Sequence, residues 1–360
     1  MPVKISKPLK FLWFLFLSLV LCFHVYGVTV GAHYYPWYRT WNFVLNQTVR
    51  ALPAIGPYDT SNPAVASQHL DQAAYAGIDV FFLEWTGPNP SDTGRIESEY
   101  DIDYGFLPAL NSKPYVKYCI FYDQAIRMDI KWGLKVPSSF DFDKSNVYNT
   151  FVSDLYHIQT KYFSDWKYFR VNGSPVVWLY LERIYSGNWR GAITQVRNNA
   201  GWNIYLIADD LWNTLDPTAR RWRWSYFDAI SCYGIGIDPN YYPDGANVRT
   251  VADVAIPVYT NWANWVTWEG KDFFWPLMAQ YDDDHLSRRD PLGEFYSDSK
   301  SDFSYFAQRI RSLITDWEYV TVTSFNEWYE TSAVEACSTP GYPYKYNWGW
   351  DFLSVLREIF

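Results

Sequence analysis

Residues 320–335 read VTVTSFNEWYETSAVE, and this stretch joins a strand pattern to a pair of acidic side chains. The alternating β-branched residues at 320–323 predict a short pleated strand. Glu327 and Glu330 follow three residues apart, and a helical turn places such a pair on one face, with Cβ atoms about 5–6 Å apart. Carboxylates that close repel each other, so one holds a proton near neutral pH while the other stays ionised. One interpretation is therefore an acid and base pair, and the other is a solvated acidic turn.

Seven further runs have the features of buried parallel strands, and helical patterns lie between them. Near-continuous apolar runs are typical of parallel strands that are covered on both faces. The predicted strands are 28–35, 78–85, 115–122, 175–181, 203–209, 227–233, 275–281 and 319–325, and the predicted helices include 64–76, 147–161, 185–200, 248–265 and 303–314. Strand alternating with helix in this way predicts the α/β class and a single (β/α)8 TIM barrel with long βα loops.

The composition excludes some partners and favours others. The formal net charge of −9 argues against nucleic acid or an anionic membrane surface as the main partner. The chain has 20 Trp and 31 Tyr residues, and part of this excess is explained by an aromatic core. Aromatic side chains with polar tips also suit stacking on sugar rings, whose faces are apolar and bordered by hydroxyl groups.

Residues 1–27 form a separate unit. Three lysines, at positions 4, 7 and 10, precede an apolar run at 11–25, and small residues follow it. This pattern predicts a cleaved secretory signal peptide, and the run is shorter than the ~20 residues of a membrane anchor. We therefore expect a secreted protein, or one in the lumen of the secretory pathway, with no stable membrane anchor and with residues 28–360 as the catalytic domain. Asn46 and Asn172 begin glycosylation sequons, which give this route weak support.

Other kinds of chemistry have little support in the sequence. The chain contains no Gly-rich phosphate loop, no zinc-ligand spacing and no Gly-x-Ser-x-Gly elbow. The acidic run at 282–285 is either a cation site or a solvated loop, and the loop is favoured because calcium loops need spaced ligands. We expect no cofactor and no metal in the chemistry. After loss of the signal peptide, three cysteines remain and allow at most one bridge; Cys119 and Cys232 are expected to be buried thiols.

Acidic and aromatic residues gather where the predicted strands end. In a barrel all of these ends meet at one rim, which carries the active site. Aromatic walls and carboxylate acceptors on one rim are what a carbohydrate hydrolase requires. The candidate catalytic residues are Glu327 and Glu330, and the candidate substrate-binding residues are Tyr34, Tyr35, Trp37, Trp85, Asp123, Tyr233, Tyr281, Asn326 and Trp328.

Four motifs resemble glycoside hydrolase family 99 and its looser family 99-like relatives, which include endo-acting α-mannosidases. GAHYYPWY at 31–38 is similar to the first-strand motif of the family, and AGID at 76–79 leading to EWTGP at 84–88 is similar to its second strand. NGSPVV at 172–177 matches its entry to strand four. SFNEWYE at 324–330 is similar to the Ser-Phe-Asn-Glu-Trp-His-Glu motif and is the most specific. The resemblance runs from residue 28 to about residue 346.

The resemblance implies a role for each candidate. Glu327 would deprotonate the 2-hydroxyl group of the sugar, giving a 1,2-anhydro sugar, and Glu330 would protonate the leaving oxygen and later activate water. Trp85 falls where the family has a tryptophan that lines the sugar site. Tyr35 lies near another sugar-contacting position, and Tyr233 matches the strand-six tyrosine.

Two departures leave the substrate open. Tyr329 replaces the histidine of the motif, and TSAVE at 331–335 replaces Gly-Thr-Gln-Ile-Glu. We therefore expect a monomeric, secreted glycoside hydrolase that cleaves an oligosaccharide or polysaccharide with α-linkages, with configuration retained. The alternatives are a family 71-like α-glucanase and a non-catalytic glycan-binding TIM barrel.

Overall fold

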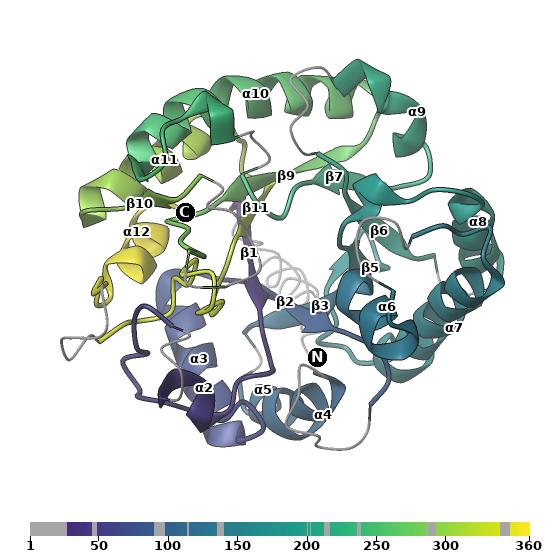
Figure 1. Cartoon of the computed structure of the whole chain (residues 1–360), viewed down its shortest axis with the longest axis horizontal. Helices are drawn as coiled ribbons and strands as arrows, with labels where there is room; N and C mark the ends of the chain where they lie inside the picture. The colour runs from purple at the N-terminus through teal and green to yellow at the C-terminus, as the bar shows by residue number, and fades with distance from the viewer. Residues whose placement is uncertain are drawn as a thin grey trace, which may run out of the picture.

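A computed structural model describes residues 27–44, 49–89, 98–113, 115–134, 140–199, 201, 203–211, 217–235, 239–284, 286, 293–338 and 346–360. Its centre is a sheet of nine strands in the order β3-β2-β1-β11-β9-β7-β6-β5-β4, and β3 also pairs with β5. That pairing closes all the strands except β4 into an eight-stranded parallel barrel (Figure 1). The barrel strands are β1 (Thr29–Tyr34), β2 (Val80–Trp85), β3 (Lys117–Tyr122), β5 (Ser174–Leu179), β6 (Tyr205–Asp209), β7 (Ala229–Ser231), β9 (Asp272–Leu277) and β11 (Tyr319–Val322).

Helices surround the barrel on its outer face (Figure 1). The first long helix shows why they form where they do: the Asn62 side chain caps its start, Pro63 occupies its first turn, and Gly77 ends it with a φ of 75°. The α-helices are α2 (Thr40–Val44), α3 (Pro63–Ala76), α4 (Glu99–Asp101), α5 (Leu107–Leu110), α6 (Gln124–Trp132), α7 (Ser145–Tyr162), α8 (Trp189–Asn199), α9 (Arg221–Trp224), α10 (Val248–Trp268), α11 (Lys300–Arg311) and α12 (Asp351–Ile359). One π-helical segment, Ile102–Phe106, and three 3-10 turns, Glu182–Ile184, Pro217–Ala219 and Pro239–Tyr241, lie in the connections.

The barrel interior is packed with aromatic rings. Phe82 and Trp178 lie with ring centroids 5.2 Å apart, and Trp178 also meets Phe274 edge-on at 6.3 Å. Gly31 on β1 leaves room for this packing, because a Cβ atom there would lie 2.2 Å from the Phe82 ring. The aromatic excess of the composition therefore has a structural role in filling the barrel.

The prediction of a (β/α)8 barrel is confirmed, and the eight predicted strands match the barrel strands with small shifts at their ends. Two features differ from expectation. Asn172 and Gly173, both with positive φ, turn the chain between the short β4 (Arg170–Val171) and β5, an antiparallel hairpin that was not predicted. The connection after β2, one of the long βα loops expected from the sequence, contains α4, the π-helical segment and α5. The short strands β8 (Ala246–Asn247) and β10 (Phe295–Tyr296) form a separate pair.

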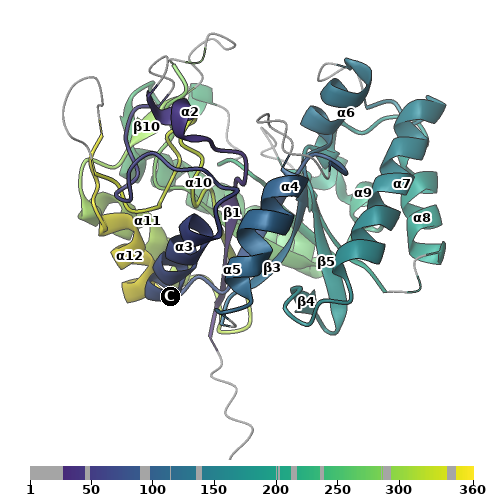
Figure 2. The same cartoon turned by 90° about the horizontal axis from the view of Figure 1, so that it is seen from below.

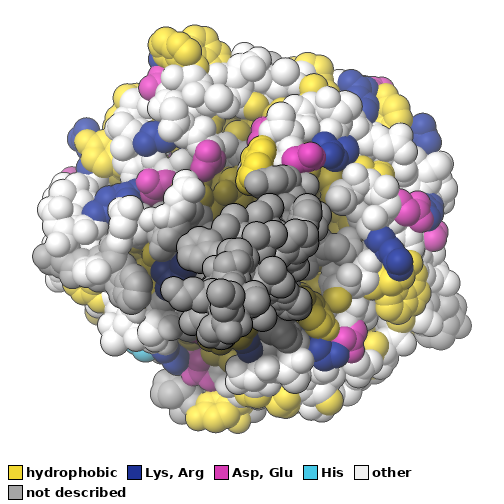
Figure 3. Space-filling model, turned by 180° about the vertical axis from the view of Figure 1, so that it is seen from behind, with side chains coloured by type: hydrophobic (Ala, Val, Ile, Leu, Met, Phe, Trp, Pro, Cys, Tyr) yellow, Lys and Arg dark blue, Asp and Glu magenta, His cyan; other side chains and the backbone are white. Residues whose placement is uncertain are grey.

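The C-terminal ends of the strands and their long loops lie together at one end of the barrel, uppermost in Figure 2. On the visible part of the opposite face, basic and acidic side chains are interspersed with apolar ones (Figure 3).

Within the described residues no helix is both long and apolar enough to cross a membrane. The predicted signal peptide lies outside the described residues, apart from Gly27. Cys119 and Cys232 are buried thiols.

Candidate active site

The loop after β11 is closed at its base by Ser324. The main chain of Ser324 pairs with that of Ser332 and Val334, with N–O distances of 3.0 and 2.9 Å. Its hydroxyl oxygen accepts a hydrogen bond from the Glu327 N–H at 2.7 Å. The residues between form a tight turn rather than the helical turn that the spacing suggests, and the Ser332 N–H donates to the Glu327 carbonyl at 3.1 Å. This network fixes the positions of Glu327 and Glu330.

Glu327 is 3% exposed, and its carboxylate accepts hydrogen bonds from two sides. Oε1 accepts from the Tyr38 hydroxyl group at 3.1 Å and from the Tyr329 N–H at 2.9 Å. The Tyr38 oxygen accepts in turn from the Trp328 N–H at 2.8 Å. Hydrogen bonds donated to a carboxylate stabilise its negative charge. The surroundings of Glu327 therefore suit a base.

Glu330 is partly exposed and faces other acidic and phenolic groups. Its main-chain oxygen accepts from the Asp282 N–H at 2.9 Å, which ties the loop to the segment after β9. Its carboxylate adds to the increase that burial causes in the pKa of Asp123, Tyr180 and Tyr233. The Glu330 carboxylate therefore lies near the acidic and phenolic groups at the barrel mouth.

Tyr35 and Tyr233 form a hydroxyl pair between the two carboxylates. The Tyr35 hydroxyl group donates to the Tyr233 oxygen at 2.5 Å, across 198 residues of sequence. Burial raises the pKa of both tyrosines, and Glu327 and Glu330 raise each further. Because both carboxylates act on the same pair, the four groups form one cluster at the mouth of the barrel.

Glu84 and Asp123 extend this acidic cluster. Glu84 is fully buried, and neither of its carboxylate oxygens accepts a hydrogen bond from a described residue. Burial raises its pKa well above the usual range, with further contributions from Asp123 and Glu327. Asp123 caps helix α6 by accepting from the Ile126 N–H at 2.9 Å, and burial raises its pKa to about 6. The surroundings of Glu84 therefore favour its neutral, protonated form more than water does.

His33 lies beneath the cluster as part of a closed floor. Its ring meets Phe121 and Trp178 with centroid distances of 4.6 and 4.7 Å, and Tyr233 at 5.1 Å. Neither ring nitrogen has a hydrogen-bond partner among the described residues, and burial lowers its pKa to about 3. A neutral imidazole in an aromatic cage closes the barrel below the site.

Trp85 and Tyr34 point away from the cluster. The Trp85 indole is fully buried outside the barrel, where its N–H donates to Glu99 Oε1 at 3.2 Å and its ring stacks on His157. The Tyr34 hydroxyl group meets His69 Nδ1 at 3.0 Å, between β1 and helix α3. The structure therefore does not bring these two side chains together with the catalytic candidates, because they pack between strand and helix.

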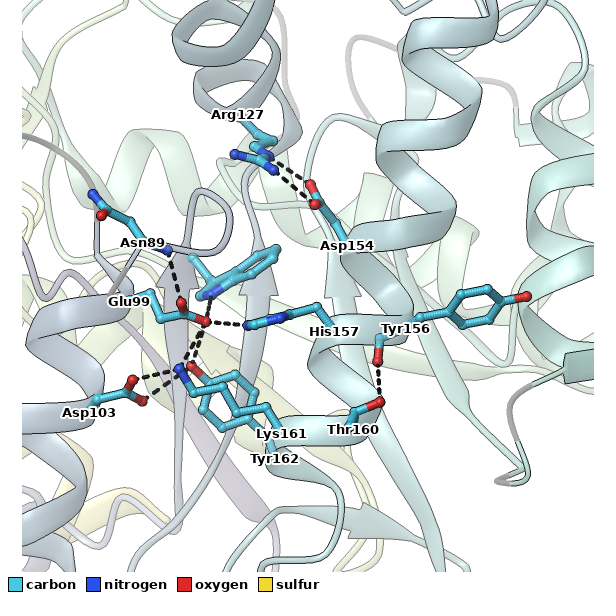
Figure 4. A network of polar contacts seen from close by, with 11 residues as sticks. Asn89, Glu99, Asp103, Arg127, Asp154, Tyr156, His157, Thr160, Lys161 and Tyr162 are labelled. Atoms are coloured by element: carbon cyan, nitrogen blue, oxygen red, sulfur yellow. Dashed lines mark hydrogen bonds and ion pairs between the residues drawn. The ribbon is translucent and has the colours of Figure 1, made fainter. Parts of the chain in front are cut away.

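Glu99 is the centre of the network that holds Trp85 (Figure 4). Its carboxylate accepts from His157 Nε2 at 2.6 Å and lies 3.1 Å from Lys161 Nζ. Burial alone would raise the Glu99 pKa, but these two partners outweigh it and lower the pKa to about 2. An ionised Glu99 therefore joins helices α4 and α7 behind the barrel wall.

Asn326 and Trp328 shape the site from behind. Asn326 is fully buried, and its side-chain amide accepts from the Tyr35 N–H at 2.7 Å and donates to the Tyr35 carbonyl at 3.0 Å. The Trp328 indole donates to Tyr58 and Glu335 and stacks on Trp348 with a centroid distance of 5.6 Å. The polar atoms of these two residues thus serve to position Tyr35 and Tyr38, and through Tyr38 the carboxylate of Glu327.

Trp37 and Tyr281 remain as partly exposed candidates. Trp37 packs on Tyr35 with ring centroids 4.7 Å apart, so an aromatic surface continues outward from the tyrosine pair. The Tyr281 hydroxyl group donates to Asp283 at 2.8 Å in the segment after β9. The structure thus gathers Tyr35, Tyr233 and Asp123 around the catalytic candidates, with Trp37 at the edge.

Tyr38 and Glu84 were not among the sequence-based candidates, although both stand within the motifs quoted above. Strand alternation places Glu84 on the same face of β2 as Phe82, but only the structure shows that the Phe82 ring, and with it this face, lies inside the barrel. For Tyr38, which lies beyond the end of β1, the sequence contains no comparable signal.

A cation could be held by the carboxylates of Asp282, Asp284 and Glu294, beside the Glu330 turn.

Comparisons with known proteins agree with this architecture. No protein-family model matches the chain, and no curated protein matches it. The GH99 endo-α-mannosidase from Bacteroides thetaiotaomicron is similar in structure, with a TM-score of 0.66, 14% identity, and coverage of 92% of this chain and 95% of that one. A glycoside hydrolase-like protein aligns with a TM-score of 0.64 and 18% identity over 100% and 97% of the two chains.

A third structure, the glycoside hydrolase family 5 mannosidase from Rhizomucor miehei, has a TM-score of 0.52 and 12% identity, with 91% of each chain covered. Identities this low describe the fold rather than the activity. The chain therefore has the barrel fold of the GH99 endo-α-mannosidases, the family that its sequence motifs resemble.

Proposed function

We propose that this protein is a glycoside hydrolase that cleaves α-linked glycans, with Glu327 as the base and Glu330 as the acid. The observation that carries the proposal is that both carboxylates flank the Tyr35–Tyr233 hydroxyl pair at the mouth of the barrel. Glu327 is buried and accepts two hydrogen bonds through Oε1, whereas Glu330 is partly exposed beside Asp123. Different surroundings for two carboxyl groups are what separate a base from an acid.

The proposed chemistry follows from these surroundings. Glu327 removes the proton from the sugar 2-hydroxyl group, which attacks the anomeric carbon and forms a 1,2-anhydro sugar. Glu330 gives its proton to the departing oxygen and then removes a proton from the water that opens the anhydro ring, while Glu327 returns its proton to the sugar 2-oxygen. The product keeps the configuration of the substrate. Tyr35 and Tyr233 hold the sugar between the carboxylates, and Trp37 offers an aromatic face at the edge.

An activity screen tests the proposal. The purified protein is incubated with a panel of α-mannans and α-glucans, with the mannans first because of the fold likeness to an endo-α-mannosidase. Chromatography identifies the products, and NMR of the first-formed product gives its anomeric configuration. We expect cleavage with retention. Inversion would contradict the anhydro-sugar route, and tight glycan binding without any product would favour the glycan-binding barrel.

We also propose that the protein enters the secretory pathway. Support comes from the basic residues and the apolar run that precede β1. N-terminal sequencing of secreted material is expected to begin near Val28. Recovery of the intact leader in a membrane fraction would contradict cleavage.

A further inference from the structure

Three carboxylates meet next to the Glu330 turn. Asp282, Asp284 and Glu294 each offer an oxygen, and these oxygens lie within 4.8 Å of one another. Asp282 and Asp284 follow β9, and Glu294 directly precedes β10. Two antiparallel hydrogen bonds between Tyr281 and Phe295, of 2.9 and 3.1 Å, bring the segments together. This backbone pairing therefore brings Glu294 to Asp282 and Asp284, and so adds a spaced third carboxylate to the acidic run at 282–285.

Glu294 gives the independent sign of a ligand. Glu294 is 5% exposed, and within the described part of the chain its Oε1 has no hydrogen-bond partner, whereas Oε2 accepts from the Tyr296 hydroxyl group. A buried carboxylate oxygen without a donor is costly unless a positive charge or a proton meets it. Among the described residues no lysine or arginine forms an ion pair with Glu294 or Asp284. Glu294 instead faces the carboxylates of Asp282 and Asp284.

The surrounding tyrosines hold the carboxylates in fixed orientations. The Tyr346 hydroxyl group donates to Asp282 Oδ2 at 2.6 Å, and the Tyr296 and Tyr346 rings stack with centroids 5.4 Å apart. Outer hydrogen bonds of this kind orient the ligands of metal sites. Tyr296 binds Oε2 of Glu294, and the other oxygen of Asp282, Oδ1, accepts a hydrogen bond from the Asp284 N–H at 3.3 Å, so the three carboxylates are held close together.

We propose that Asp282, Asp284 and Glu294 bind a calcium ion that braces the turn carrying Glu330. Calcium prefers oxygen ligands at about 2.3–2.6 Å, so two ligands of one ion lie at most about 5.2 Å apart. The three oxygens, which all lie within 4.8 Å of one another, meet this limit. Magnesium demands near-ideal octahedral geometry and usually keeps several waters, bound through one or two carboxylates, so a site of three carboxylates favours calcium.

The brace acts through the backbone of Asp282. Its N–H donates to the Glu330 carbonyl at 2.9 Å, and its own carbonyl accepts from the Thr331 hydroxyl group at 3.0 Å. An ion that fixes Asp282 therefore fixes the main chain on both sides of the Glu330–Thr331 peptide bond. The binding of calcium is independent of the proposed hydrolysis, and its test needs no substrate.

Thermal unfolding of the full mature chain tests this proposal. Protein treated with EDTA and desalted is melted with increasing CaCl2 or MgCl2, and calorimetric titration with CaCl2 gives the stoichiometry. We expect one calcium per chain and a saturable rise in Tm of roughly 5 °C at a hundredfold excess over Kd, because the ion binds only the folded state. A flat Tm would mean that protons alone bridge the carboxylates, and an equal response to magnesium would overturn the choice of calcium.

Variants locate the ion. Glu294→Gln and Asp284→Asn should each remove the calcium response, and the exposed position of Asp284 makes its variant safe for folding. Glu358→Gln, an exposed carboxylate on α12 paired with Lys300, is the matched control and should keep the full response. A calcium response that persists in Asp284→Asn would place the ion elsewhere and overturn the proposal.

Discussion

Tyr38 and Glu327 are joined by a buried hydrogen bond of 3.1 Å, in which the phenol donates to Oε1 of the carboxylate. The phenol oxygen also accepts from the main chain of Trp328, so one side chain holds both the carboxylate and its backbone. Tyr38 follows β1 and Glu327 follows β11, and these strands are neighbours in the barrel. The neighbouring strand thus positions the proposed base.

Tyr38→Phe should lower turnover by about 10- to 100-fold, because a hydrogen bond to a charged group contributes about 1.5–3 kcal/mol. The free energy of unfolding should fall by about 1–3 kcal/mol as well, since the Trp328 N–H loses its acceptor. Steady-state kinetics and urea unfolding measure the two effects. Tyr104→Phe, at an exposed tyrosine, is the control. Full activity in Tyr38→Phe would show that the phenol has no part in holding Glu327.

Trp85→Ala should destabilise the protein by about 3–5 kcal/mol, the usual cost of removing a buried tryptophan. The indole packs against His157 and bonds to Glu99, so the loss also leaves part of a buried polar network unmatched. Chemical unfolding measures this change, and Trp317→Ala, at a 66% exposed position, should stay within about 0.5 kcal/mol of the parent. If Trp85→Ala kept its full stability but bound glycans more weakly, Trp85 would be a substrate-binding residue instead.

Trp37→Ala is the complementary change. Trp37 is partly exposed and packs on Tyr35, so its loss should weaken glycan binding by about 1–3 kcal/mol and leave cooperative unfolding in place. Calorimetry with a glycan that the protein cleaves, using an inactive background, gives the affinity. Unchanged affinity would remove Trp37 from the binding surface.

Glu84→Gln should change how stability depends on pH. The folded-state pKa of Glu84 is raised above its unfolded value, so folding favours the protonated acid. The stability that this contributes is complete below about pH 4.5 and is lost as pH rises toward the folded pKa. Glutamine cannot ionise, so the variant should gain stability relative to the parent between pH 5 and pH 8. Urea unfolding of the parent and the variant at pH 5 and pH 8 checks this. If the difference in their free energies of unfolding were the same at both pH values, the raised pKa of Glu84 would be contradicted.

The eight strands could be predicted because parallel strands buried on both faces are apolar along their whole length. The strand ends were less certain, and β7 shows why. The run at 227–233 is mostly apolar, with Asp228 and Ser231 as its polar residues, but only Ala229–Ser231 pairs as a strand. Beyond it the Tyr233 N–H donates to the Asp209 side chain instead of to a neighbouring strand. Side-chain acceptors of this kind leave no periodic trace in a sequence.

The site was predicted in part. Glu84 and Trp85 are neighbours on one strand, so only one of them can face the barrel axis, and strand periodicity does not say which. The answer depends on Phe82, whose ring lies inside against His33. Asn326 and Trp328 stand in the most specific motif, yet their polar atoms are used by Tyr35, Tyr58 and Glu335. A motif locates a site, but long-range contacts decide which of its residues face the substrate.

The most direct test of the proposed chemistry compares Glu330→Gln with Glu327→Gln on two kinds of substrate. Glutamine at 330 cannot protonate the leaving oxygen, so turnover of a natural glycan should fall by about 10²–10⁴-fold. An aryl or fluoride glycoside needs less protonation and should lose less, whereas Glu327→Gln should harm both substrates alike.

Both variants should melt at or above the parent Tm, because each relieves repulsion between like charges. The measurement is kcat/KM for the parent and both variants on the best natural glycan and on its aryl glycoside. We predict a collapse on both substrates for Glu327→Gln and a partial rescue on the aryl glycoside for Glu330→Gln. Full activity of the two variants on the natural glycan would contradict the catalytic assignment, and the glycan-binding barrel would take its place.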